Sequence, residues 1–277
     1  MMSSVNIFRL VSIVFFLTFT GLAVFAKDNP PDPITWNENL KELLYDDDEV
    51  FLDGSDFFSL QTPYRALDAA IVPITINFTQ DQKIDNYVKS LIIIVDENPS
   101  PVVSRFTFNT KTGNASLTTR IRVDKYTYVR AIAEMNDNSK YMVANYVKAA
   151  GGCSAPSLGD MDSVMARLGK MKMKFIKTGE KNSLNKAEFL ISHPNFSGLQ
   201  FNQLTRSEIP AHFVNSVVIK QDSEIIFEAF PDISLSEDPS FIFNYRDSGG
   251  PLVVEVEDSD GQKFSGEFSS SNIAFSE

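Results

Sequence analysis

The sequence is poor in residues that carry chemistry. Its 277 positions include one cysteine, Cys153, two histidines and one tryptophan. A single cysteine excludes a disulfide within the chain. The histidines, His193 and His212, have no carboxylate at a spacing that suggests a triad, so the sequence offers no nucleophile with a base in reach. We therefore predict no catalytic residues.

Positive charge is also scarce. The chain has 25 lysines and arginines against 36 aspartates and glutamates, which gives a formal net charge of −11. This balance argues against nucleic acid and anionic membrane surfaces as partners. A basic protein such as a cytochrome is electrostatically compatible. The hydrophobic fraction of 43% supplies real cores, and the length favours two domains over one.

Long apolar runs are absent except near the N-terminus. Arg9 gives a positive start, residues 10–19 are almost wholly apolar, and Val24 and Ala26 fit the small-residue rule for cleavage. We predict a signal peptide over residues 1–26, a mature chain from Lys27, and a periplasmic protein with no membrane attachment after cleavage. An uncleaved anchor is the alternative, but the run is short for a span of about 20 residues.

The mature chain reads as all-β after one short N-terminal helix. Thr35 and Glu38 form a capping box that opens the helix. Alternating apolar residues then mark short strands, and the run 91–95 indicates a strand buried on both sides. In one of the strands, Thr118, Arg120 and Arg122 lie on the face opposite the apolar residues. The pattern predicts two β-sandwich domains, 27–153 and 169–277, joined by a connector over 154–168 that contains a short helix.

The stretch Gly151-Gly152-Cys153 ends the first domain and leads into the connector. Glycine visits backbone angles that other residues avoid, so Gly151 and Gly152 are predicted to be a hinge. Cys153 is predicted to be an exposed thiol that can be loaded covalently. The alternative is an inert loop or core cysteine. An odd cysteine in an oxidising compartment is either reactive or paired between chains, so a disulfide dimer through Cys153 is left open.

A metal site is a weaker interpretation of the same region. Four methionines lie near Cys153 in the sequence, and thioethers with a thiolate or histidine suit Cu(I). Two of them alternate with lysines, as a core-facing strand should, which favours packing over metal binding. The methionines are Met161, Met165, Met171 and Met173. We predict no metal ligands.

Several motifs carry a family resemblance. The segments 120–123, 131–134 and 147–153 resemble the end of the SoxY sulfur carrier, which displays its cysteine on a Gly-Gly arm. The second half resembles its partner SoxZ through Leu190-Ile191-Ser192-His193-Pro194, Gly198-Leu199, Ile209-Pro210, Asp238-Pro239-Ser240-Phe241, Ser248-Gly249-Gly250 and Glu257-Asp258-Ser259-Asp260-Gly261. The whole is similar to fused SoxYZ-like carriers associated with quinoprotein dehydrogenases.

The resemblance implies two immunoglobulin-like sandwiches and a carrier rather than an enzyme. It assigns to Cys153 a covalent sulfur intermediate, as a thiosulfonate or persulfide, with no other cofactor. Partners would be periplasmic sulfur-oxidation enzymes or c-type cytochromes, or a quinoprotein dehydrogenase system. In the two-chain family the cysteine lies almost at a free C-terminus, whereas here Ser154-Ala155-Pro156 follows it.

Two other classes of protein stay open. One is an accessory or metal-delivery factor for a quinoprotein (PQQ) dehydrogenase, which would use Cys153 and the nearby methionines. The other is a structural β-sandwich module in which Cys153 is dispensable and unreactive.

Overall fold

The computed structural model describes residues 29–156, 161–202 and 205–270. The predicted signal peptide and part of the predicted connector, residues 157–160, lie outside these ranges. Among the described residues, no helix has the length and apolar character needed to cross a membrane.

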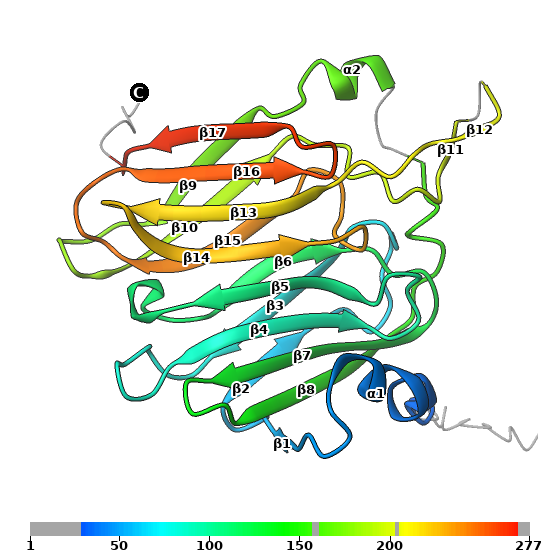
Figure 1. The fold of residues 1–277 in the computed structure, drawn as a ribbon, viewed down its shortest axis with the longest axis horizontal. Coiled ribbons are helices and arrows are strands. Elements are labelled where there is room, and N and C mark those ends of the chain that lie inside the picture. Colours follow the sequence, from blue (N-terminus) through cyan, green and yellow to red (C-terminus); the bar gives the residue numbers. More distant parts are fainter. Residues whose placement is uncertain (1–28, 157–160, 203–204, 271–277) are drawn as a thin grey trace, which may run out of the picture. The chain divides into compact units, whose positions relative to one another are not determined.

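The described part of the chain from Pro33 onward is dominated by two large sheets (Figure 1). The first sheet has nine strands, in the order β1 (Phe51–Asp53), β8 (Lys140–Val147), β7 (Thr127–Met135), β4 (Val88–Val95), β5 (Val102–Phe108), β14 (Glu224–Pro231), β13 (Val214–Gln221), β16 (Leu252–Asp258) and β17 (Lys263–Phe268). The second has six, in the order β2 (Phe58–Gln61), β3 (Val72–Phe78), β6 (Leu117–Ile121), β15 (Ser240–Arg246), β10 (Leu184–Ile191) and β9 (Met171–Lys177). Neighbouring strands are antiparallel except for β1 and β8, which are parallel.

The smaller elements connect these strands. They are the helical turns η1 (Trp36–Leu40) and α1 (Lys41–Leu44), the 3-10 turn η2 (Thr110–Thr112), the short helix α2 (Met161–Met165) and the two-stranded ribbon of β11 (Phe201–Asn202) and β12 (Ser207–Glu208). The short helix predicted in the connector is therefore present as α2.

The alternation in the sequence places the core. Val72, Ile74, Ile76 and Phe78 point inward from β3, as predicted. All of residues 91–95 are buried because β4 has a cover on each side: Leu91 and Ile93 face the main core, while Ile92 and Ile94 pack under Trp36 and Leu40 of η1. The prediction of a strand buried on both faces is confirmed.

The N-terminal helical segment is present, but the predicted capping box is wrong. Thr35 already has helical backbone angles and makes no side-chain cap; its hydroxyl donates instead to the carboxylate of Glu97. The segment is held by Arg130, whose guanidinium lies 4.6 Å from the centre of the Trp36 ring. Arg130 also forms a buried ion pair with Asp96, with Nη2 to Oδ2 at 2.7 Å.

The two halves of the chain are joined through both sheets. β5 pairs with β14 and β6 pairs with β15, so the residues of both sandwiches enter one hydrophobic core. Phe106 and Phe108 from the first half contact Phe227 and Phe241 from the second. The all-β sandwich class is confirmed. The sequence interpretation did not include β14, and this strand makes the joint in the nine-stranded sheet; residues 33–277 consequently form one compact unit.

Candidate functional site

The segment that follows β8, residues 148–156, is called the arm below. It leaves β8 and runs toward α2 (Figure 1). Backbone amides hold its first part, with Gly151 N donating to Asp124 O at 2.8 Å and Gly152 N to Val123 O at 3.0 Å. Side chains hold its second part, because the Ser197 hydroxyl donates to Cys153 O and Gln200 Nε2 donates to Ala155 O at 2.7 Å. The arm is therefore docked against both halves of the chain.

The two glycines of the arm are needed for different reasons. Gly151 has a φ of +81°, and a Cβ placed there would meet no atom within 4 Å, so conformation alone favours glycine. At Gly152 the reason is space: a Cβ would lie 2.0 Å from Ala69 O and 2.7 Å from Val123 O. Their role as a hinge stays a prediction; in the docked arm, Gly152 is the residue that permits close approach to the body.

Cys153 is fully buried, with a relative exposure of 0%. The prediction of an exposed thiol is therefore wrong for the docked arm. The physical reason is that Ser197 and Gln200, more than forty residues further along the chain, supply hydrogen bonds to arm carbonyls. Local sequence around Cys153 contains no sign of these partners.

The docked thiol is protected chemically as well as sterically. Burial, and then the negative charge of Asp124, raise the pKa of Cys153 from an ordinary value of 9.0 to about 12, against the opposing effects of the Arg122 charge and a hydrogen bond with Ser234. The thiolate is the nucleophilic form of cysteine, so a docked Cys153 is almost entirely the unreactive thiol at neutral pH.

Arg122 lies beneath the arm and is 1% exposed. Its Nη1 donates to the carbonyls of Asn195 at 2.7 Å, Ile233 at 3.1 Å and Leu235 at 2.6 Å, while its buried Nε has no partner. The expected alternation holds, since Ile121 and Val123 on either side of Arg122 both enter the main core. Arg122 is nevertheless buried, unlike Arg120, because the backbone of the second half of the chain covers its guanidinium. Burial lowers the pKa of Arg122, and the nearby Cys153 acts in the opposite direction.

The two histidines meet at a buried carboxylate. His212 Nε2 lies 2.8 Å and His193 Nε2 3.5 Å from Asp258 Oδ2, and His212 Nε2 is 3.6 Å from Asp260 Oδ2. The other Asp258 oxygen accepts the amides of Asp260 and Gln262. This cluster was not predicted from the sequence, because the fold brings together residues that are far apart in the chain and that no local spacing connects.

Histidine and aspartate are metal ligands, and the three ligand atoms lie within 4.8 Å of one another. However, His193 Nδ1 accepts the backbone N–H of Asn195 at 3.0 Å. A neutral ring in this arrangement carries its proton on Nε2, so Nε2 has no lone pair for a metal. The cluster is better described as a hydrogen-bonded pair of His212 and Asp258 with His193 beside it, its buried Nε2 3.5 Å from Asp258 Oδ2 and without a hydrogen-bond partner among the described residues.

The methionines near Cys153 give no support to a copper site. Met171 and Met173 of β9 are half-buried against the hydrophobic core and alternate with exposed lysines, as the packing interpretation predicted. Met165 of α2 is exposed.

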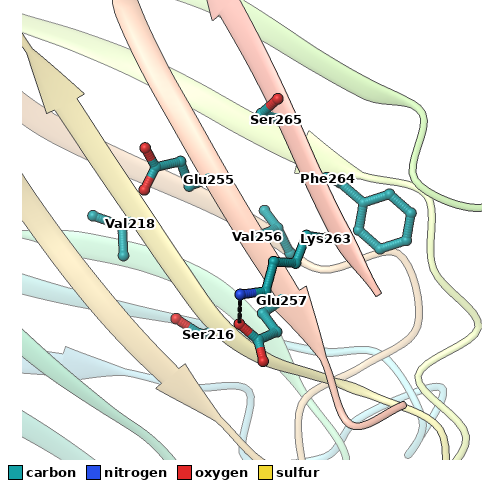
Figure 2. Close-up of a pocket in the computed structure, with 8 residues that line it drawn as sticks. All are labelled: Ser216, Val218, Glu255, Val256, Glu257, Lys263, Phe264 and Ser265. Atoms are coloured by element: carbon teal, nitrogen blue, oxygen red, sulfur yellow. Dashed lines mark ion pairs between the residues drawn. The ribbon is translucent and has the colours of Figure 1, made fainter. Parts of the chain in front are cut away.

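A hollow with a volume of about 250 Å³ lies over β13, β16 and β17 (Figure 2). Its lining pairs Lys263 Nζ with Glu257 Oε2 at 3.3 Å. The residues drawn there include no thiol and no imidazole, so we assign it no role. They are Ser216, Val218, Glu255, Val256, Glu257, Lys263, Phe264 and Ser265.

Comparison with known families accounts for both halves of the site. Residues 41–153 match the model of the sulfur oxidation protein SoxY, and residues 173–269 match that of the sulphur oxidation protein SoxZ. The chain belongs to the fused SoxYZ-like carriers. The SoxY match ends at Cys153. Ser197, Gln200 and Ser234 belong to the SoxZ half, so the thiol of one half is covered by side chains of the other.

Solved structures show weaker likenesses. The sulfur carrier protein SoxY of Chlorobium limicola f thiosulfatophilum is 20% identical over 33% of this chain and 74% of that one, with a TM-score of 0.28. A superoxide reductase (neelaredoxin) of Ignicoccus hospitalis is 11% identical over 33% and 79%, with a TM-score of 0.29. A putative superoxide reductase of Thermotoga maritima is 12% identical over 37% and 95%, with a TM-score of 0.31. Scores this low carry no functional argument. No curated protein matches the chain.

Proposed function

We propose that this SoxYZ-like protein is a periplasmic covalent carrier that holds a sulfur intermediate on Cys153 for partner enzymes of sulfur oxidation. The observation that carries the proposal is the position of Cys153. It is the only cysteine, it ends the SoxY match, and it lies on a glycine-containing segment that hydrogen bonds hold against both halves of the chain. A thiol with these properties is kept for chemistry rather than for a disulfide.

The docked arm divides the carrier cycle into two states. Docked, the thiol is buried, protonated and closed to partners. Released, it would recover the ordinary pKa and reactivity of an exposed cysteine. Loading, transfer and unloading belong to the released state, and the docked state protects the empty thiol from oxidation.

The cargo chemistry determines what partners must supply. Joining a cysteine thiolate to thiosulfate forms a sulfur–sulfur bond and releases two electrons, so that reaction needs an electron acceptor such as a c-type cytochrome. Transfer of a sulfane sulfur from a partner persulfide exchanges one thiolate for another and needs no acceptor. The electron acceptor and any general base are expected in the partner, and the chain itself acts as a carrier and not as an enzyme.

Tetrathionate provides a direct test because it loads a thiol without an enzyme. The Cys153 thiolate attacks a central sulfur, forms the cysteine thiosulfonate and releases thiosulfate. Mass spectrometry of the intact protein should show one added thiosulfonate group, which reductant removes and which Cys153→Ser lacks. The arm of the Gly152→Ala variant cannot dock, so its thiol is accessible to tetrathionate. If neither the wild type nor Gly152→Ala is modified, the carrier proposal fails. The accessory or metal-delivery alternative gains no observation in its favour.

A further inference from the structure

We propose that His193 is a positioning residue for the arm: its neutral imidazole orders the segment 195–200 that docks Cys153, so protonation of His193 releases the thiol. The inference concerns access to Cys153. As a control on sulfur transfer, it rests on the proposed carrier function.

The His193 imidazole holds the backbone of Asn195. His193 Nδ1 accepts the amide of Asn195 at 3.0 Å, and both residues are buried. Asn195 has a φ of +48°, in the left-handed region that asparagine enters more readily than most non-glycine residues. The imidazole lone pair supports this turn by satisfying the buried Asn195 amide.

Asn195 in turn connects several elements. Its carbonyl accepts Arg122 Nη1 at 2.7 Å, its Nδ2 donates to Leu235 O at 3.1 Å, and its Oδ1 accepts the amide of Val214 at 2.9 Å. A shift of this one residue disturbs the seat of the buried arginine beneath the arm and the start of β13.

The residues that follow Asn195 hold the arm at Cys153. Two residues further along, Ser197 donates to Cys153 O, and Gln200 donates to Ala155 O while its Oε1 accepts the amide of Ser197 at 3.2 Å. The side-chain contacts that hold the second part of the arm thus come from the turn that His193 positions.

Protonation of the neutral His193 ring can occur at only one of its nitrogens. Nε2 already carries a proton in the neutral ring, so the new proton enters at Nδ1, where it opposes the N–H of Asn195. The docked state therefore requires the neutral ring. In agreement, burial and then the neighbouring His212 lower the pKa of His193 to about 4, despite the favourable contacts with Asp258 and Asn195.

The charged surroundings of His193 come from four elements. Asp258 and Asp260 belong to the β16–β17 hairpin and His212 to the segment before β13. Asp238, in the segment before β15, accepts the His193 amide on Oδ1 and binds Arg167. Arg122 approaches through Asn195 O. The carboxylates ordinarily titrate near pH 4, so a response between pH 7 and pH 5 reports on imidazoles.

The sign of the effect follows from the pKa of His193. The docked pKa is depressed, so the docked arm is favoured above the ordinary histidine pKa of 6.5 and loses that advantage as the pH falls toward 4. If the released state exposes His193 fully, the ratio of docked to released arm falls by up to about 20-fold between pH 7 and pH 5.

The experiment measures protection of the Cys153 thiol in the full chain. Labelling uses a dipyridyl disulfide, which reacts with thiols in mild acid. Protection is the labelling rate of the denatured protein divided by that of the folded protein at the same pH, so that the change of the ordinary thiolate fraction with pH cancels. Protection should fall between pH 7 and pH 5. His193→Asn, which keeps an acceptor near the Nδ1 position but cannot titrate, should be protected equally at both values.

The matched control is His212→Gln, which removes the other imidazole and keeps a donor toward Asp258. It should retain the pH response. Constant protection of the wild type from pH 7 to pH 5 overturns the inference, and so does a response that survives in His193→Asn or disappears in His212→Gln. The wild-type profile decides the matter even if a variant does not fold. Failure of Cys153 to accept a thiosulfonate in the Gly152→Ala variant at pH 7 would instead refute the carrier proposal.

Discussion

Substitution of Gly152 is expected to have the largest effect on docking of the arm. In Gly152→Ala, the added methyl group would lie 2.0 Å from Ala69 O and 2.7 Å from Val123 O. Both contacts are with backbone, so no side-chain rotation relieves them. The arm must move away, which breaks the Gly152 N to Val123 O bond of 3.0 Å and uncovers Cys153.

The expected size of the effect follows from the thiol. Burial holds the pKa of docked Cys153 at about 12, against an ordinary value of 9.0. At pH 8 this lowers the thiolate fraction by about 1000-fold relative to a released arm. We therefore expect Gly152→Ala to be alkylated by iodoacetamide on the order of 100- to 1000-fold faster than the wild type, and at nearly the rate of the denatured chain.

Two glycine variants serve as controls. Gly151→Ala meets no atom but must adopt a positive φ, which costs roughly 1–2 kcal/mol and should raise the rate only about tenfold. Gly261→Ala has the same kind of φ and the same open space in the β16–β17 hairpin, away from the arm, and should label like the wild type. An unchanged labelling rate in folded Gly152→Ala would refute the docking geometry.

Three further predictions concern the rest of the chain. N-terminal sequencing of the exported protein should begin at Lys27, and an intact Met1 end in the soluble pool would contradict signal cleavage. Limited proteolysis should cut first within 154–168, whereas first cuts inside β4 or β16 would contradict the predicted connector. Ser197→Ala leaves Cys153 O and the Leu199 amide without their hydrogen-bond partner. The rate of thiol labelling should therefore rise about five- to 100-fold, with little change in melting temperature. A labelling rate equal to that of the wild type would show that Ser197 does not help to dock the arm.

Local sequence patterns were sufficient for most of the strands, although not for β14. The alternation within Val72 to Phe78 and within Leu252 to Val256 identified strands with one buried face, and the unbroken run 91–95 identified a strand covered on both faces. These predictions succeed because side-chain direction in a strand has a period of two. The same periodicity did not reveal that Arg122 is buried, because its cover comes from the backbone of Asn195, Ile233 and Leu235 in the second half of the chain.

The candidate site depended on contacts that no local pattern contains. Cys153 could be found because it is the only cysteine and follows two glycines, but the burial of its thiol depends on Ser197, Gln200 and Ser234. His193 and His212 approach each other only because β13 and β16 pair beside the segment that follows β10. In a single sequence, no local pattern signals contacts between residues that are far apart along the chain.

The central claim is that Cys153 carries sulfur, and the most direct measurement is the mass of the protein as the cell makes it. The exported protein, isolated without reductant from cells oxidising a reduced sulfur compound, should contain a fraction heavier by a thiosulfonate or persulfide group. Fragmentation should place that group on the peptide containing Cys153, and reductant should remove it. A native protein whose Cys153 is found only as the free thiol, both in such cells and after treatment of Gly152→Ala with tetrathionate, would contradict the account.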